Sequence, residues 1–213
     1  MKISYCTSVW NEHNELDALL RVLIQSIDDT DEIVIQGDQG KVTSEVLSVL
    51  HRYLKDTRVK YHEYPLRKDF AKFKNQMFSQ CSGDWIFNLD ADELIRPEAI
   101  RTLKLLIINN PDVDCYAFPR VNYVNGLTPE HCKQWGWKVQ KINGIEVVNW
   151  PDYQRRLFIN NGLIYFNPEI KVHERLDGYR NCAYLPDDST DWAIMHYKEI
   201  DRQISQNNFY NSI

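Results

Sequence analysis

The sequence predicts an α/β fold in which a mostly parallel central sheet is flanked by helices. Short apolar runs of strand length alternate with segments whose apolar residues recur at helical spacing, and this alternation fills the first half of the chain. Alternating strands and helices are typical of parallel βαβ units. Because 213 residues suffice for one sizeable core and are few for two ordinary domains, we expect a single domain.

The elements of the first half can be placed in order. Strands are expected at Ile3–Val9, Glu32–Gln36, Arg58–Glu63 and Trp85–Leu89. Helices are expected over Leu16–Ile27, Val46–Leu54, Asp69–Gln80 and Pro97–Ile108. Pro97 suits a first helical turn because the N–H that proline lacks has no partner inside the helix there.

After about residue 111 the pattern becomes mixed and rich in loops. Strands are expected at Cys115–Phe118, Gln154–Ile159, Leu163–Phe166 and Ala193–Tyr197, and a last helix at Glu199–Tyr210. This half also holds four tryptophans, at positions 135, 137, 150 and 192. We interpret most of them as core residues, with a platform for stacking a sugar ring as the alternative.

The composition excludes several classes of protein. Hydrophobic residues make up 43% and charged residues 26% of the chain, which is typical of a globular protein. A net charge of -5 argues against a broad electrostatic grip on nucleic acid, so nucleic acid is a disfavoured partner. Five cysteines without a C-x-x-C pair, and no signal-peptide pattern, favour a cytoplasmic protein whose only membrane contact is peripheral.

An acidic motif, Asn88-Leu89-Asp90-Ala91-Asp92-Glu93, directly follows a predicted apolar strand. Residues two apart in an extended chain point to the same side, so Asp90 and Asp92 can both face a cleft at the carboxyl end of the sheet. Carboxylate oxygens are suitable ligands for Mn²⁺ or Mg²⁺. The alternative is an acidic pair that complements the dipole of the following helix.

Further motifs occur in a fixed order around this one. They are Cys6-Thr7-Ser8-Val9-Trp10-Asn11-Glu12, Asp31-Glu32-Ile33-Val34-Ile35 with Asp38, Gly83-Asp84-Trp85, Asp152 to Phe158, Val172-His173-Glu174 and His196-Tyr197. With them the chain resembles glycosyltransferase family 2, which has the GT-A fold, and especially its branch of lipopolysaccharide-core β-glucosyltransferases. The resemblance implies one Rossmann-like GT-A domain over residues 1–213, with a nucleotide-sugar half at 1–110 and an acceptor-side half at 111–213.

The resemblance also implies roles for individual residues. The residues expected to contact the donor are Thr7, Asn11, Glu12, Asp38, Lys74, Asp90 and Arg156. Those expected to contact the metal are Asp92, Asp90 and His196. Two positions depart from the family pattern: Lys74 replaces the usual arginine, and Gln39-Gly40-Lys41 replaces a turn rich in serine and aspartate. A histidine packed at a strand end and an arginine in a surface ion pair are the alternatives for His196 and Arg156.

An inverting glycosyltransferase needs a base that accepts the proton of the acceptor hydroxyl. Glu174 is the first candidate, because it lies downstream of the acidic motif and shortly before His196, the order that the resemblance implies. Asp152 is the second candidate. The alternatives are structural: Asp152 as a turn residue after Pro151, and Glu174 in an exposed ion pair.

The sequence therefore predicts an inverting, metal-dependent enzyme that moves a sugar from a nucleoside diphosphate sugar, by family habit a UDP-sugar, to an acceptor hydroxyl. The resemblance implies an acceptor on a surface glycan or lipopolysaccharide core. A hydroxymethylated base in phage DNA and a non-catalytic nucleotide-sugar-binding module are the alternatives. A haloacid-dehalogenase-like phosphatase is disfavoured, because Glu93-Leu94 follows the acidic pair where that family has a hydroxyl-bearing residue.

Overall fold

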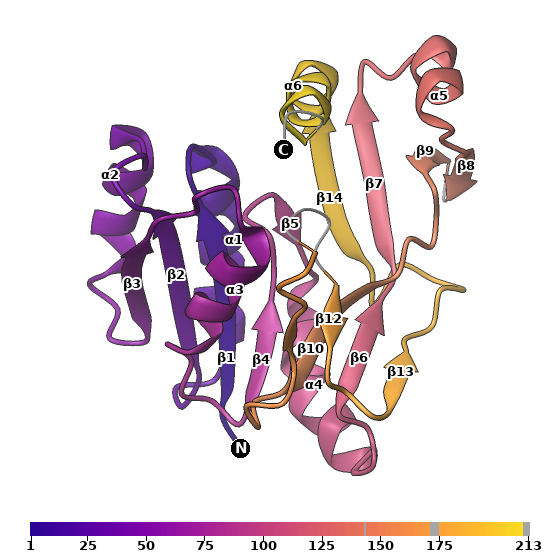
Figure 1. Ribbon diagram of the computed structural model, residues 1–213. Helices are drawn as coiled ribbons and strands as arrows, with labels where there is room; N and C mark the ends of the chain where they lie inside the picture. Colours follow the sequence, from indigo (N-terminus) through magenta and orange to yellow (C-terminus); the bar gives the residue numbers. More distant parts are fainter. Residues whose placement is uncertain (143, 171–174, 211–213) are drawn as a thin grey trace.

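The computed structural model describes residues 1–142, 144–170 and 175–210. Its largest sheet has seven strands (Figure 1). The strand order is β13-β6-β10-β4-β1-β2-β3. The strands are β1 (Ile3–Val9), β2 (Glu32–Asp38), β3 (Val59–Tyr64), β4 (Trp85–Asn88), β6 (Cys115–Phe118), β10 (Gln154–Ile159) and β13 (Cys182–Tyr184). As the alternating pattern predicts, β1 pairs in parallel with β2 and β4, and β2 with β3. β10 is antiparallel to β4 and β6.

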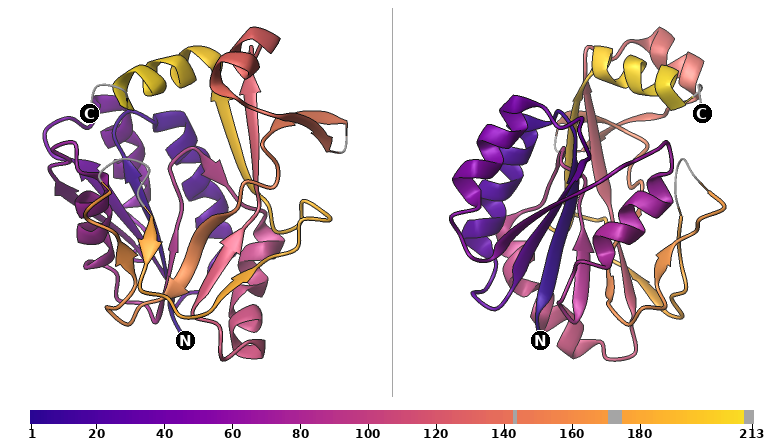
Figure 2. Two further views of the ribbon diagram at one scale, coloured as in Figure 1. Left: turned by 45° about the vertical axis from the view of Figure 1, so that its right-hand side comes forward. Right: turned by 60° about the vertical axis from the view of Figure 1, so that its left-hand side comes forward.

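Helices cover both faces of this sheet (Figure 2). They are α1 (His13–Ser26), α2 (Ser44–Tyr53) and α4 (Pro97–Asn109) on one face, and α3 (Phe70–Phe78) on the other, next to the small β11 (Tyr165–Phe166) and β12 (Leu176–Asp177) sheet. Successive side chains of a strand point to opposite faces. Accordingly Tyr5 and Val9 join the core under α1, whereas Cys6 joins the core under α3.

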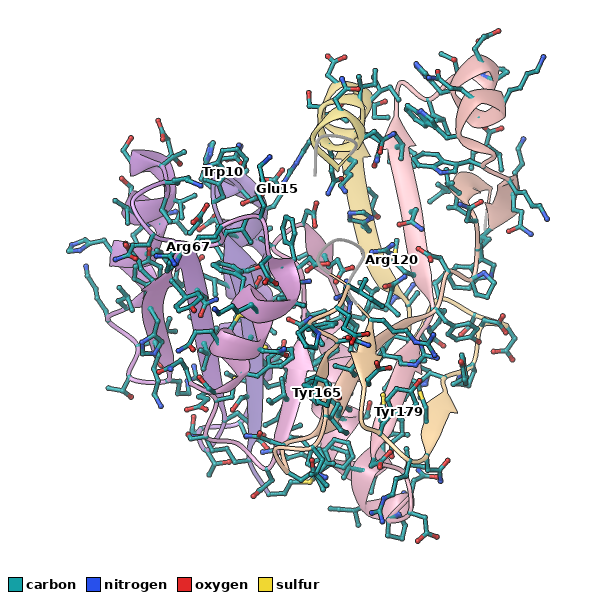
Figure 3. All side chains as sticks on the ribbon, viewed as in Figure 1. Trp10, Glu15, Arg67, Arg120, Tyr165 and Tyr179 are labelled. Atoms are coloured by element: carbon teal, nitrogen blue, oxygen red, sulfur yellow. The ribbon has the colours of Figure 1, made fainter. Side chains whose placement is uncertain are left out.

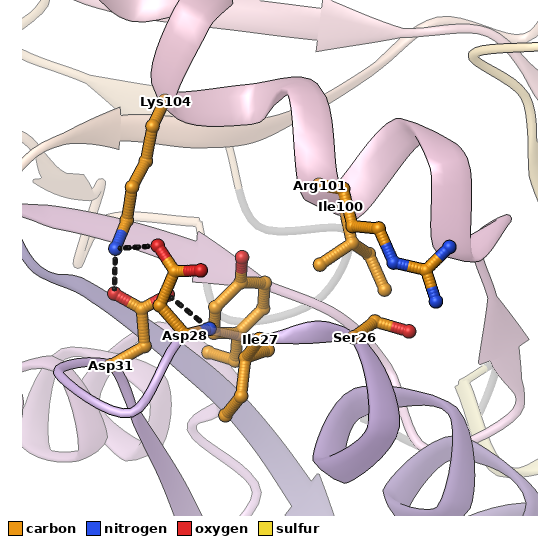
Figure 4. A pocket seen from close by; sticks show the side chains of 8 residues that line it. Ser26, Ile27, Asp28, Asp31, Ile100, Arg101 and Lys104 are labelled. Atoms are coloured by element: carbon orange, nitrogen blue, oxygen red, sulfur yellow. Dashed lines mark hydrogen bonds and ion pairs between the residues drawn. The ribbon is translucent and has the colours of Figure 1, made fainter.

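An ion-pair cluster fastens α4 to the loop between α1 and β2 (Figure 4). Lys104 Nζ lies 2.6 Å from Asp28 Oδ2 and 2.8 Å from Asp31 Oδ1. Asp31 Oδ1 also accepts the backbone N–H of Ile3 at 2.9 Å. The adjoining cavity of about 10 Å³ has room for one water at most, so this cluster is a structural feature.

A second sheet has five strands in the order β5-β14-β7-β9-β8. It brings strands from the C-terminal half of the chain next to the acidic motif, whose last residue, Glu93, begins β5. Its strands are β5 (Glu93–Leu94), β7 (Arg120–Asn125), β8 (Val139–Ile142), β9 (Ile145–Val148) and β14 (Ile194–Glu199). α5 (Pro129–Trp135) follows β7, and α6 (Ile200–Tyr210) follows β14. Because β14 pairs with β5, His196 lies opposite Glu93, one residue beyond Asp92. None of the helices among the described residues has the length and hydropathy needed to cross a bilayer.

Candidate active site

Asp90 lies just beyond the end of β4 and faces two buried cations. Its Oδ1 accepts a hydrogen bond from Lys74 Nζ of α3 at 2.9 Å, and its Oδ2 accepts one from Arg156 Nη2 of β10 at 2.6 Å. Lys74 and Arg156 are only 6% and 5% exposed. Burial favours the neutral carboxyl, but the charges of Arg156 and Lys74 outweigh it and hold the pKa of Asp90 well below its ordinary value. Three of the predicted donor residues therefore form one cluster.

Glu93, which the sequence analysis gave no role, is the fully buried centre of the neighbouring network. It accepts hydrogen bonds from Arg156 Nη2, from Arg120 Nη1 at 3.0 Å and from the backbone N–H of Asp90 at 3.1 Å. Arg120 is the first residue of β7 (Figure 3), and its guanidinium contacts both Glu93 and Asp152. Glu93 thus links the strand that carries Arg156 to the strand that carries Arg120.

Asp152, the second candidate base, lies on the other side of Arg120. Its Oδ2 accepts hydrogen bonds from Arg120 Nη2 at 2.7 Å and from Asn122 Nδ2 at 2.6 Å, and its Oδ1 accepts one from Gln154 Nε2 at 3.0 Å. Burial favours the neutral carboxyl, but the charge of Arg120 and the hydrogen bond from Asn122 lower the pKa of Asp152. The carboxylate oxygens of Asp152 are thus occupied by protein donors.

The bond between Asp152 and Asn122 fixes which ring nitrogen carries the proton when His196 is neutral. An ionised carboxylate only accepts, so the Asn122 amide turns its Nδ2 to Asp152 and its Oδ1 to His196 Nδ1, 2.8 Å away. His196 Nδ1 then donates to Asn122, so Nε2 of the neutral imidazole presents its lone pair to Asp92 Oδ2, 3.4 Å away, whereas Nε2–H of the protonated imidazolium donates to that oxygen. Two electron-rich atoms face each other favourably only with a cation or a proton between them. This arrangement fits a metal ligand whose orientation is set by a hydrogen bond to its other ring nitrogen.

Asp92 is surrounded by further cations that the sequence analysis missed. Lys198 Nζ and Arg202 Nη2 lie 3.9 and 3.8 Å from Asp92 Oδ2. Arg202 also pairs with Glu12 at 3.0 Å and Glu15 at 2.6 Å, so α6 is joined to the start of α1 over the acidic motif. Glu15 points toward α6 from α1 (Figure 3). Positions 198 and 202 are hard to assign from sequence, because only the pairing of β14 with β5 and β7 brings them here.

The ionisation of Asp92 predicts a pH-dependent stability. Burial raises its pKa, but the hydrogen bond and positive charge of the protonated His196 imidazolium outweigh burial and lower the pKa to about 2. A carboxyl with a depressed folded-state pKa stabilises the fold above its unfolded pKa and loses that contribution as pH falls through the folded value. From pH 4 to pH 2, we expect the stability advantage of wild type over Asp92→Asn to shrink by about 2 kcal/mol, measured by urea unfolding. A constant difference between the two proteins over this range would contradict the assignment.

The other predicted donor residues lie at the carboxyl ends of β1 and β2. Glu12 Oε2 accepts the backbone N–H groups of Trp10 at 2.8 Å and Asn11 at 3.0 Å, and Asn11 itself is exposed. Asp38 is 6% exposed, accepts the backbone N–H of Leu66 at 2.9 Å and pairs with Lys41 at 3.1 Å. Glu12 is joined to the Asp92 cluster through Arg202, whereas Asp38 lies among residues of the turns after β2 and β3.

Thr7 is buried in β1 and, by strand alternation, points to the same side as Tyr5 and Val9, under α1. Its hydroxyl has no hydrogen-bond partner among the described residues. No hydrogen bond among the described residues therefore joins the Thr7 hydroxyl to Asp90 or Asp92. Glu174, the first candidate base, lies outside the described residues.

The metal ligands expected from the sequence do not form a closed set in the part of the chain that the structure describes. Within that part, no group of three or more His, Cys, Asp or Glu side chains is arranged to hold an ion. Asp90 is engaged by Lys74 and Arg156, so the protein ligands that meet are Asp92 and His196. Such a pair leaves most positions of an octahedral ion to other oxygen ligands.

Comparison with known proteins identifies the family. The sequence model of glycosyl transferase family 2 matches residues 4–166. The chain belongs to this family. The mostly parallel sheet with helices on both faces is the GT-A fold of this family.

Individual relatives agree with this fold. Protein CgeD of Bacillus subtilis (strain 168) is 26% identical over 132 residues, which cover 58% of this chain and 30% of CgeD. The crystal structure of S. aureus TarS superposes with a TM-score of 0.63 at 18% identity, over 94% of this chain and 37% of TarS. The mannosyltransferase PcManGT from Pyrobaculum calidifontis, in complex with GDP-Man and Mn²⁺, gives 0.59 at 17% identity, over 91% of this chain and 56% of PcManGT. The chain thus spans about a third of the length of CgeD and TarS.

Proposed function

We propose that this chain transfers a sugar from a UDP-sugar to an acceptor hydroxyl, with inversion and with help from Mn²⁺ or Mg²⁺. The observation that carries the proposal is the pair of Asp92 and His196, with the Nε2 lone pair of His196 turned to the carboxylate by Asn122. Complexes of TarS with UDP and with UDP-GlcNAc, and of PcManGT with GDP-Man and Mn²⁺, support donors and a metal of this kind.

The proposed donor site combines a metal position with a cluster of cations. Asp92 and His196 would hold the ion, which when bound neutralises negative charge on the departing diphosphate. Lys198 and Arg202 flank Asp92 and are placed to attract the diphosphate. In this proposal the half-exposed Asp90 carboxylate contacts the ribose or the metal's surroundings. In this proposal residues 1–110 supply Asp90 and Asp92, and residues 111–213 supply the acceptor side and also His196, Lys198 and Arg202 of the donor site.

We propose Glu174 as the base and Asp152 as a positioning residue. The base accepts the acceptor's proton while the acceptor oxygen bonds to the anomeric carbon, and the bond from that carbon to the phosphate oxygen breaks with its electron pair leaving on UDP. Asp152 is poorly suited to this task, because its oxygens accept hydrogen bonds from Arg120, Asn122 and Gln154. Its position behind Asn122 instead lets it orient His196.

Release of UDP from a panel of UDP-sugars in Mn²⁺, with water or glycans as acceptor, tests this function. We expect Glu174→Gln to bind the donor as wild type does and to lose about 10²–10⁴-fold in turnover. Asp152→Asn is the matched control. We expect it to lose turnover as well, but together with weaker Mn²⁺ binding. Normal turnover by Glu174→Gln would exclude Glu174 as the base. Failure of the wild type to bind any nucleotide sugar would exclude the whole proposal.

The finer assignment concerns the acceptor. We propose a hydroxyl of a surface glycan, in agreement with the resemblance of the acidic and Asn11-Glu12 motifs to the lipopolysaccharide-core branch.

A further inference from the structure

A groove of about 580 Å³ lies between the end of β7, helix α5 and the β8–β9 hairpin. This volume is within the range of sites that bind small ligands. Its lining combines apolar side chains with Trp137, Thr128 and the carboxylate of Glu146. No residue that we assign to the donor or metal site lines it.

Strand register places this groove on the same sheet face as the metal position. Residues paired directly across neighbouring strands have their side chains on one face. His196 pairs with Asn122, Asn122 with Val148, and Val148 with Val139. Val148 and Val139 line the groove. A continuous strip of one sheet face therefore runs from the His196 imidazole to the groove.

Part of the opposite face of the same sheet is closed by packing. Val121, Val147 and Ala193 form a buried cluster there, with Trp150 packed against it. The groove lies beside this cluster, and Tyr123, two residues after Val121 on β7, contributes to its lining.

Helix α5 holds the indole of Trp137 in place. Trp135 stacks on His131 with 5.0 Å between ring centroids, and Trp137 packs on Trp135 at 4.8 Å. His131 is fixed by a capping box with Thr128, and the Trp137 backbone N–H donates to Cys132 O at 2.9 Å. The sequence analysis expected core positions for most tryptophans, but Trp135 and Trp137 are half-exposed. None of the side chains of α5 is buried, so core packing does not explain this helix.

We infer that this groove binds a sugar ring of the acceptor glycan, next to the ring whose hydroxyl reacts. Trp137 presents a rigid apolar surface suited to the C–H face of a pyranose, and the Glu146 carboxylate is placed at the groove to accept hydrogen bonds from sugar hydroxyls. Glu146 has only a loose pairing with Lys141, 3.8 Å away, and both side chains are largely exposed. This inference rests on the proposed glycosyltransferase function.

Binding to an array of immobilised oligosaccharides, in the presence of UDP and Mn²⁺, tests the inference. We expect wild type to bind a subset of the glycans, and both Trp137→Ala and Glu146→Gln to bind the same glycans at least about tenfold more weakly. Glu146→Gln preserves shape and is exposed, so it keeps the test valid if Trp137→Ala is unstable. Tyr184→Ala, which removes an exposed aromatic ring from β13 outside the groove, is the control and should bind as wild type.

Donor binding separates failure of the groove from failure of the function. We expect UDP to bind wild type and all three variants equally. Glycan binding unchanged in both groove variants, or a wild type that binds UDP but no glycan, would overturn the inference. A wild type that binds no UDP would instead contradict the proposed function.

Discussion

Replacing Glu93 by glutamine is expected to lower the free energy of unfolding by about 3 kcal/mol, because the change removes the carboxylate that two largely buried arginines share and leaves each with one carboxylate partner, Asp90 or Asp152. Glu93 is fully buried and accepts hydrogen bonds from Arg156, from Arg120 and from the backbone N–H of Asp90. A glutamine has one accepting oxygen, so its amide group must face at least one of these donors. Urea unfolding at neutral pH measures the loss.

Glu98→Gln is the matched control for this prediction. Glu98 is in the first turn of α4, its side chain is 76% exposed, and its pairing with Arg101 at 3.8 Å is weak. We expect this variant to differ from wild type by no more than about 0.5 kcal/mol. A Glu93→Gln protein as stable as the Glu98→Gln protein would show that the Glu93 network does not hold the two halves of the site together.

Replacing Asn122 by leucine is expected to weaken Mn²⁺ binding about 10–100-fold, the usual effect of removing a partner that orients a metal ligand. Without the amide oxygen, His196 Nδ1 loses its acceptor, and the imidazole is no longer held with the Nε2 lone pair toward Asp92. Calorimetric titration of Mn²⁺ into the protein saturated with UDP measures the effect.

Asn125→Leu is the control on the same strand, because Asn125 is exposed and contacts Glu199, not His196. We expect Asn125→Leu to bind Mn²⁺ as wild type does. Equal affinities for the Asn122 and Asn125 variants would mean that His196 needs no orienting partner, or that it is not a ligand.

The framework of the fold was predictable from the sequence because its signals are local. The run Ile3–Val9 is a strand with the predicted bounds, and the leucines at helical spacing after it form the buried face of α1. Other bounds moved by a few residues: Asp69, expected inside a helix, is the N-cap of α3, and the expected strand from Leu163 is confined to Tyr165–Phe166.

The second sheet was mostly missed, because its sequence carries weak local signals. The β8 residues Val139–Ile142 are largely exposed and have no apolar run, and β7 alternates only partly. α5 is short and contains no buried residue, so it has no amphipathic pattern. These elements form because they pair with strands far away in the chain. The periodicity of a single sequence carries no information about such pairing.

In the candidate site, too, some residues were predictable from the sequence and others are brought in only by long-range strand pairing. The cluster of Asp90 with Lys74 and Arg156 unites residues that the family resemblance had already implied. Arg120 and Asn122 reach the site only through the pairing of β7 with β14, although their spacing by two on a strand was a readable sign of a shared face. Whether Asp92 and His196 hold a metal, and whether Glu174 is the base, stay predictions.

The central claim is that Asp92 and His196 form the metal position of a nucleotide-sugar site. Calorimetric titration of UDP-glucose and UDP-GlcNAc into wild type and Asp92→Asn, each with Mn²⁺ and with EDTA, tests it most directly. We expect saturable binding by wild type in Mn²⁺, and binding at least about tenfold weaker in EDTA or with Asp92→Asn. Donor binding that is equally strong in EDTA and in the Asp92→Asn protein would contradict a metal site at this position.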